Sequence, residues 1–146
     1  MINTNRLIAL GCWIMLATLP GCSSESDNAD VRFAKTLLFS MVNGTAAESA
    51  IDWEAFHTDE EDVGAAYKAL PNEVEKASFR KSFLLGFAAS TPNLKLNPEG
   101  VTRWRVQSAT PSETIVAANT QKGVVMLLTV SKRDGNQKLS GLRIEK

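Results

Sequence analysis

Residues 124–145 read VVMLLTVSKRDGNQKLSGLRIE and decide the fold of this 146-residue chain. The run from Val124 to Val130 is almost continuously apolar, as in a central strand that is covered on one face and partly on the other. The dipeptide Asp134-Gly135 favours a tight two-residue turn between antiparallel strands. Residues 139–145 are therefore expected to pair back on this strand as the last strand of a sheet.

Two further predicted strands precede this hairpin. In residues 101–107 (VTRWRVQ) the alternation places Trp104 on one face of a strand, and Arg103 and Arg105 on the other. Residues 113–120 (ETIVAANT) form the next predicted strand, after a short polar connection. The second half of the chain therefore predicts an antiparallel meander of about four strands.

The preceding residues have helical spacing instead. Apolar residues recur every three or four positions over about residues 31–43, with Asp30 as the expected N-cap and Gly44 as the stop. The segments that begin at Thr45 and at Thr58 both have the spacing of a capping box, and each predicts a short helix.

A longer helix is expected from Asn72 to about residue 89, where Thr91-Pro92 should end it. Gly86 lies inside its apolar stripe and offers room for the close approach of another backbone segment. About four helices followed by about four strands predict an α+β fold, with the helices packed on one face of the antiparallel sheet.

The first 21 residues are expected to be a signal peptide. Arg6 is the only charged residue before residue 25, and residues 7–19 (LIALGCWIMLATL) are almost wholly apolar. This run is shorter than the roughly 20 apolar residues of a membrane-spanning helix. It fits the apolar region of a secretory signal, in which Cys12 is a residue removed on processing.

The tetrapeptide Leu19-Pro20-Gly21-Cys22 resembles the lipobox of bacterial lipoproteins. The resemblance implies that Cys22 is linked to diacylglycerol, becomes the mature N-terminus and is then N-acylated, although Pro20 stands where the family usually has Ala, Ser or Thr. It also implies outer-membrane localisation, because Ser23 replaces the Asp that often retains such proteins in the inner membrane. Several acyl chains would make a firm anchor.

The expected organisation is thus a signal peptide over residues 1–21, a lipidated cysteine with a polar tether over 22–29, and a single domain over 30–146. No disulfide is expected, because Cys22 is the only cysteine left after processing and is acylated. With 44% hydrophobic and 22% charged residues, the composition excludes a disordered chain, a multi-pass membrane protein and a uniformly basic nucleic-acid binder.

Lys and Arg together number 16, as do Asp and Glu, so the formal net charge is zero. This neutrality is a cancellation: residues 22–75 contain 3 basic and 12 acidic residues, whereas residues 76–146 contain 12 and 4. Pairing between the two parts is expected to satisfy some of the difference. The basic face of the sheet is the first place to expect an anionic partner, such as lipid head groups or an acidic protein.

The element order and the aromatic segment at residues 51–56 (IDWEAF) resemble the nuclear transport factor 2-like, or cystatin-like, superfamily. The resemblance covers about residues 30–146 and implies a cone-like fold, in which a curved sheet wraps a long helix and leaves a pocket at its open end. Members usually have a strand between the early helices, and no segment here stands out as that strand.

Five residues are candidate contacts for a ligand or partner: Trp53, His57, Arg103, Trp104 and Arg105. The clustered aromatic residues are expected mainly to fill the core, with pocket lining as the alternative. The acidic run at residues 59–62 lacks the spacing of a calcium loop, so no metal and no cofactor are expected.

Two functions remain open at this point. The first is a non-enzymatic lipoprotein of the cell envelope that binds a partner protein or a small apolar ligand. The alternative is an enzyme resembling ketosteroid isomerase, in which a pocket carboxylate works with His57 as a general base or with Tyr67. The sequence contains no catalytic constellation that would favour the enzyme.

Overall fold

The computed structural model describes residues 28–94, 96 and 99–145. Its elements are helix α1 (Ala29–Val42), the 3-10 turn η2 (Glu48–Ala50), strand β1 (His57–Thr58), helices α2 (Val63–Lys68) and α3 (Glu73–Leu94), and strands β2 (Thr102–Ala109), β3 (Glu113–Asn119), β4 (Val125–Arg133) and β5 (Asn136–Glu145). The α+β class is confirmed. The described residues form three α-helices and five strands, rather than four of each. The predicted signal peptide and the predicted lipidation site Cys22 lie outside the described residues.

The five strands form one mixed sheet in the order β1-β5-β4-β3-β2. Strands β2 to β5 make the predicted antiparallel meander. At the β4–β5 turn Asp134 and Gly135 have φ angles of 53° and 75°, the left-handed conformation that this dipeptide favours. The strand missing from the sequence prediction is β1, which runs parallel to β5 with His57 opposite Gly141. A strand of two residues is too short to show the alternation of apolar and polar side chains by which a strand is predicted from sequence.

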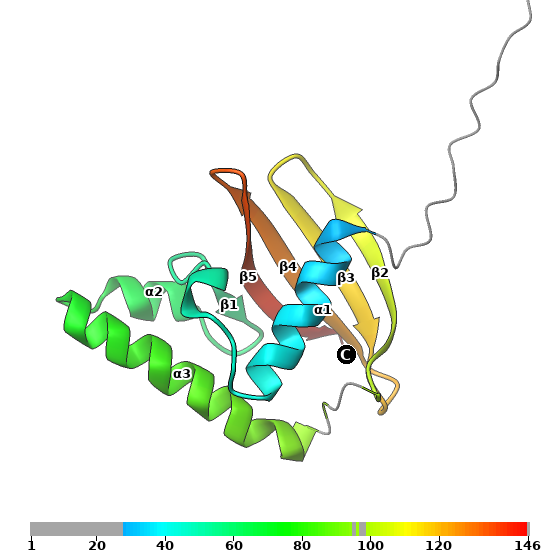
Figure 1. Cartoon of the computed structure of the whole chain (residues 1–146), viewed down its shortest axis with the longest axis horizontal. Coiled ribbons are helices and arrows are strands. Elements are labelled where there is room, and N and C mark those ends of the chain that lie inside the picture. Colours follow the sequence, from blue (N-terminus) through cyan, green and yellow to red (C-terminus); the bar gives the residue numbers. More distant parts are fainter. Residues whose placement is uncertain (1–27, 95, 97–98, 146) are drawn as a thin grey trace, which may run out of the picture.

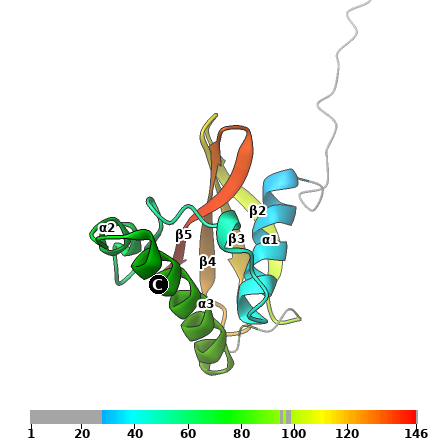
Figure 2. The same cartoon turned by 60° about the vertical axis from the view of Figure 1, so that its left-hand side comes forward.

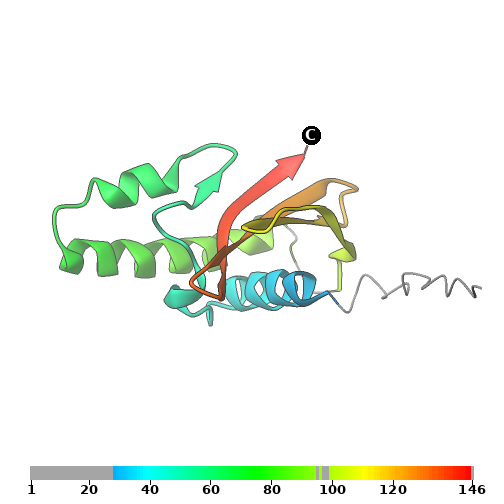
Figure 3. The same cartoon turned by 90° about the horizontal axis from the view of Figure 1, so that it is seen from above.

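Helix α1 and helix α3 lie in different relations to the sheet (Figures 1 and 2). Helix α1 contacts β2, β3, β4 and β5. Its buried face consists of Val31, Ala34, Leu37, Leu38 and Met41, as the helical spacing predicted. Helix α3 packs mainly against α1 and diverges from the strands, which is also visible from above in Figure 3. A space therefore opens between α3 and the β4–β5 side of the sheet.

The start of α1 differs from the prediction. Asn28 is the N-cap, because its side-chain oxygen accepts from the backbone N–H groups of Asp30 and Val31. Asp30 lies inside the first turn, and its carboxylate instead accepts hydrogen bonds from the sheet. The capping box expected at Thr45 does not form either. Only the single turn η2 follows it, without a side-chain cap.

Helices α2 and α3 form in the predicted regions of the chain, but some of their ends differ from the prediction. Asp62, rather than Thr58, caps α2 by accepting from Ala65 N at 2.9 Å. The predicted start of α3 is confirmed, since Asn72 accepts from the backbone N–H of Glu75. Helix α3 continues past residue 89 to Leu94, with Pro92 in its last turn. Pro92 has no N–H for the Ala88 carbonyl, which accepts from the Thr91 hydroxyl at 2.7 Å instead.

The ion pairs between described residues join the acidic first part of the chain to the basic second part. Asp30 pairs with Lys132, and Asp52 pairs with Arg133. Glu48 and Glu73 both pair with Arg80 of α3. The charge separation in the sequence is therefore partly satisfied inside the fold, as expected. Within the residues that the structure describes, no helix is long and apolar enough to cross a membrane.

Candidate functional site

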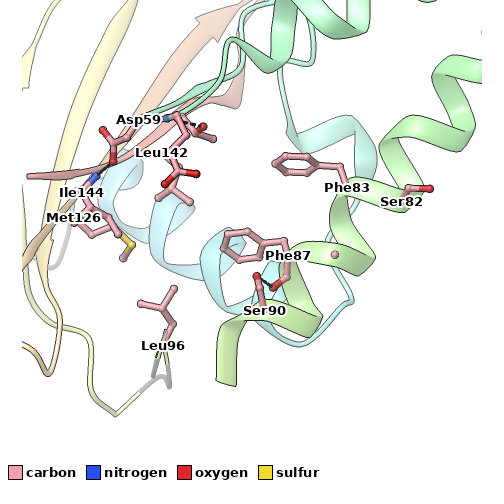
Figure 4. A pocket seen from close by; sticks show the side chains of 12 residues that line it. Asp59, Ser82, Phe83, Phe87, Ser90, Leu96, Met126, Leu142 and Ile144 are labelled. Atoms are coloured by element: carbon pink, nitrogen blue, oxygen red, sulfur yellow. Dashed lines mark hydrogen bonds between the residues drawn. The ribbon is translucent and has the colours of Figure 1, made fainter. Parts of the chain in front are cut away.

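An open cavity of about 490 Å³ occupies the space between α3 and the sheet. Figure 4 shows side chains from α3 on one wall, and from the start of the β1–α2 loop, β4 and β5 on the other. Its volume lies within the range of small-molecule sites. The apolar lining residues are Phe83, Phe87, Leu96, Met126, Leu142 and Ile144, and the others are Thr58, Asp59, Glu60, Ser82, Gly86 and Ser90.

Gly86 helps to form this cavity. It lies one helical turn from Phe83 and Ser82 on the face of α3 that lines the space. A Cβ added at Gly86 would meet no atom within 4 Å. The close backbone approach expected there is therefore wrong. Its missing side chain leaves room in the cavity instead.

A cluster of aromatic rings supports the inner wall. Trp53 contacts Phe83 edge-on, with ring centroids 5.6 Å apart, and Phe56 contacts Phe83 at 5.5 Å. Tyr67 and Phe79 complete the cluster, and Tyr67 also receives a 2.6 Å hydrogen bond from Arg80. Such edge-to-face contacts fix ring orientations. Phe83 is thus held in place on one side and faces the cavity on the other.

Most polar groups at the rim are already hydrogen-bonded within the protein. The Thr58 hydroxyl accepts from the backbone N–H groups of Glu60 and Glu61, and Ser90 donates to the Phe87 carbonyl. The Asp59 carboxylate accepts from the backbone N–H of Ile144 and so covers the edge of β5 beyond the short β1. The exposed Glu60 carboxylate forms no hydrogen bond or ion pair with a described residue.

The five candidate residues from the sequence do not meet at this cavity. Trp53 is buried in the aromatic cluster, and Trp104 packs on Phe39 of α1 with ring centroids 6.1 Å apart. Arg103 has a positive φ of 52° at a bulge in the edge strand β2, so the simple alternation predicted there is interrupted. Arg105 hydrogen-bonds to the Asn119 side chain. Both arginines lie at the sheet edge opposite His57.

His57 does not line the cavity, although its neighbours Thr58 and Asp59 do. Its ring lies beside Gly141, where an added Cβ would come within 2.6 Å of the imidazole Cε1. The Nδ1 atom is 3.3 Å from the Ala55 carbonyl oxygen. Gly141 therefore provides space for the imidazole. Among the residues that the structure describes, no carboxylate is within hydrogen-bonding distance to orient His57 as a general base.

A second, more polar cavity of about 310 Å³ brings Tyr67, the tyrosine of the enzyme hypothesis, together with two carboxylates. Asp52, Glu54 and Tyr67 line it together with Arg133. However, Asp52 is paired with Arg133 at 3.1 Å, and the Tyr67 hydroxyl accepts from Arg80. Hydrogen bonds to Glu48 and Glu73 raise the pKa of Arg80 above its usual value, so this partner stays cationic.

Among the described residues, no group of three or more His, Cys, Asp or Glu side chains could hold a metal ion. Comparison of the chain with protein-family models, curated proteins and solved structures finds no match. Phe83 and Phe87 belong to the aromatic residues for which the sequence leaves pocket lining as the alternative to core packing. No local pattern marks Met126, Leu142 or Ile144 as lining, because their meeting with α3 depends on the strand order.

Proposed function

We propose that this protein is a lipid-anchored envelope protein whose α+β domain binds a small apolar ligand in the cavity between α3 and the sheet. The observation that carries the proposal is the cavity itself: six apolar side chains face about 490 Å³ of space that none of the described residues fills. A protein core is normally packed to near-crystalline density. An open apolar space of this size therefore supports binding.

Substitution of Gly86 tests this proposal directly. In Gly86→Phe the ring should enter the cavity, because nothing lies within 4 Å of the new Cβ. We expect the affinity for the neutral fluorescent probe N-phenyl-1-naphthylamine to fall about tenfold or more, which corresponds to about 1.4 kcal/mol. Gly86→Ala is the matched control and should bind like the wild type. Equal binding by all three proteins, or none by the wild type, would contradict the proposal.

The lipid anchor is supported by the lipobox-like tetrapeptide and the polar segment after it. We expect Cys22→Ser to move the protein from the membrane fraction to the soluble fraction, because a single polar side chain replaces the acyl chains. The measurement is immunoblotting after fractionation of cells. Cys12→Ser changes the other cysteine in the same way and should leave the protein in the membrane. A Cys22→Ser protein that stays membrane-bound would show the anchor to be wrong.

The proposed relationship to the nuclear transport factor 2-like superfamily has two supports. The described residues include a short strand β1 between the early helices, where members usually have one. They also have a long helix facing a sheet with a cavity between them, as in the cone-like fold of that superfamily.

The enzyme alternative is favoured by one observation, which is that Asp52, Glu54 and Tyr67 line one cavity. It receives less support than binding, because Arg133 and Arg80 already engage the Asp52 carboxylate and the Tyr67 hydroxyl. Proton transfer requires such groups to reach a substrate. An isomerase activity lost in both Asp52→Asn and Tyr67→Phe would favour it over the binding function.

A further inference from the structure

We propose that the ligand of the cavity between α3 and the sheet is a cationic amphiphile: an apolar body that carries a protonated amine or quaternary ammonium group. This inference rests on the proposed function, since it specifies what the same cavity binds. The apolar walls account for the body of such a ligand. The charge of its polar group follows from the residues at the rim.

The charged residues among the cavity's described lining are Asp59 and Glu60, both of them acids. The Asp59 carboxylate accepts one backbone hydrogen bond, from Ile144, through a single oxygen. The Glu60 carboxylate is exposed and has no hydrogen-bond or ion-pair partner among the described residues. A cation at the mouth would gain attraction from both carboxylates while its hydrocarbon part stays in contact with Phe87 and Met126.

The surroundings strengthen this negative potential. Asp59 and Glu60 begin a run of four acids that ends at Asp62, and all four are exposed in the loop before α2. The ion pairs between described residues use other acids, in η2, α1, α3 and the turn before β1. None of the four loop acids has an ion-pair partner in the part of the chain that the structure describes. No described cation therefore offsets these charges, and those of Asp59 and Glu60 lie at the cavity mouth.

The same arrangement disfavours an anionic amphiphile such as a fatty acid. Its carboxylate would lie beside Asp59 and Glu60, and no described lining residue is basic. Like charges at short range repel and also lose hydration. A neutral amphiphile would use the apolar walls only. The cavity should therefore rank three ligands of equal chain length in the order cation, neutral, anion.

The test is displacement of N-phenyl-1-naphthylamine by decyltrimethylammonium, decanol and decanoate, each below its micelle concentration. The protein used spans residues 22–146 and carries Cys22→Ser, so that no detergent is needed; thermal unfolding checks that it is folded. At about 10 mM ionic strength, where screening is weak, we expect the ammonium compound to bind about fivefold more tightly than decanol. Decanoate should bind more weakly than either.

Two variants locate the effect. Glu60→Gln removes one carboxylate charge at the rim without breaking a contact between described residues, and should reduce the preference for the ammonium compound over decanol. Glu61→Gln removes the same charge from the adjacent exposed residue, which does not line the cavity, and should retain most of the preference. At about 1 M ionic strength the preference should largely disappear, since the Debye length falls to about 3 Å.

The outcomes separate the two proposals. If decanol and decanoate bind as tightly as the ammonium compound, or the preference is the same in Glu60→Gln, the inference about charge is overturned while the apolar binding function stands. If none of the three compounds displaces the probe, or the probe does not bind, the binding function fails and the inference fails with it.

Discussion

Asp30→Ala should lower the free energy of unfolding by about 2–3 kcal/mol, because it removes a buried carboxylate to which several side chains donate hydrogen bonds. The carboxylate accepts from the Thr114 hydroxyl at 2.7 Å and from the Gln137 side chain, and pairs with Lys132 at 3.0 Å. Thr114 is only 1% exposed, so its hydroxyl would lose its partner without gaining water. Lys132 is 40% exposed in its side chain and can be hydrated, which limits the loss.

Chemical denaturation at pH 7 measures this loss, with Glu54→Ala as the control. Glu54 is an exposed acid with no ion pair to a described residue, so its replacement should change stability by less than about 0.5 kcal/mol. A comparable loss in both variants would mean that Asp30 does not join α1 to β3 and β5 in solution.

The contribution of Asp30 should also depend on pH. Burial alone would raise the pKa of Asp30, but hydrogen bonds from Thr114, Gln137 and Lys132 outweigh it and hold the pKa below its usual value. A carboxyl with a lowered folded-state pKa stabilises the protein above its unfolded pKa of about 3.9, and loses that contribution as the pH falls through the folded value. The stability difference between wild type and Asp30→Asn should therefore shrink below about pH 4. A difference independent of pH would contradict this.

Gly64→Ala should destabilise the protein by about 2–3 kcal/mol, because a methyl group at this position meets backbone atoms. The added Cβ would be 2.5 Å from the carbonyl oxygen of Glu54 and 2.9 Å from its carbon. The backbone N–H of Gly64 donates to the Phe56 carbonyl at 2.7 Å, so the segments cannot separate without losing this bond. Thermal or chemical denaturation measures the effect.

Gly86→Ala is the matched control, since it makes the same change in another helix. There the Cβ meets nothing within 4 Å, and alanine is the better helix former. We expect Gly86→Ala to stabilise the protein by up to about 1 kcal/mol. If Gly64→Ala were equally well tolerated, the start of α2 would not pack on the turn before β1 in the way that positions Asp59 and Glu60.

Prediction from the sequence was most successful where local signals and the fold agreed. The apolar stripe of α1, the Asn72 cap of α3 and the Asp134-Gly135 turn are each set by residues within a few positions of one another. The errors concern long-range partners. The sequence predicts Asp30 as a helix cap. Its carboxylate instead accepts hydrogen bonds from Thr114 and Gln137, which are 84 and 107 positions away. The predicted end of α3, at about residue 89, is too early. The helix continues because the Thr91 hydroxyl donates to the Ala88 carbonyl in place of the N–H that Pro92 lacks.

The candidate site was less predictable than the fold. The strand β1 has only two residues and forms because β5 offers a free edge, which no local pattern can reveal. Their charge makes Arg103 and Arg105 candidate contacts for a ligand or partner. The strand order, however, places them at the edge of the sheet opposite His57. Glu60 lies in the acidic run 59–62, which lacks the spacing of a calcium loop, and its place beside an apolar cavity depends on the tertiary structure.

Local patterns predict the α+β class, the meander of β2 to β5 and the opposite charges of the two parts of the chain, because periodicity, turn residues and composition can be read over short stretches. Which acids form ion pairs, and where a cavity opens, depends on the packing of distant elements. Helix α3 packs on α1 and diverges from the sheet, so that apolar residues distant in sequence face one cavity, beside two carboxylates that form no ion pair with a described residue. Such a space depends on the relative placement of whole elements, which local residue patterns do not specify.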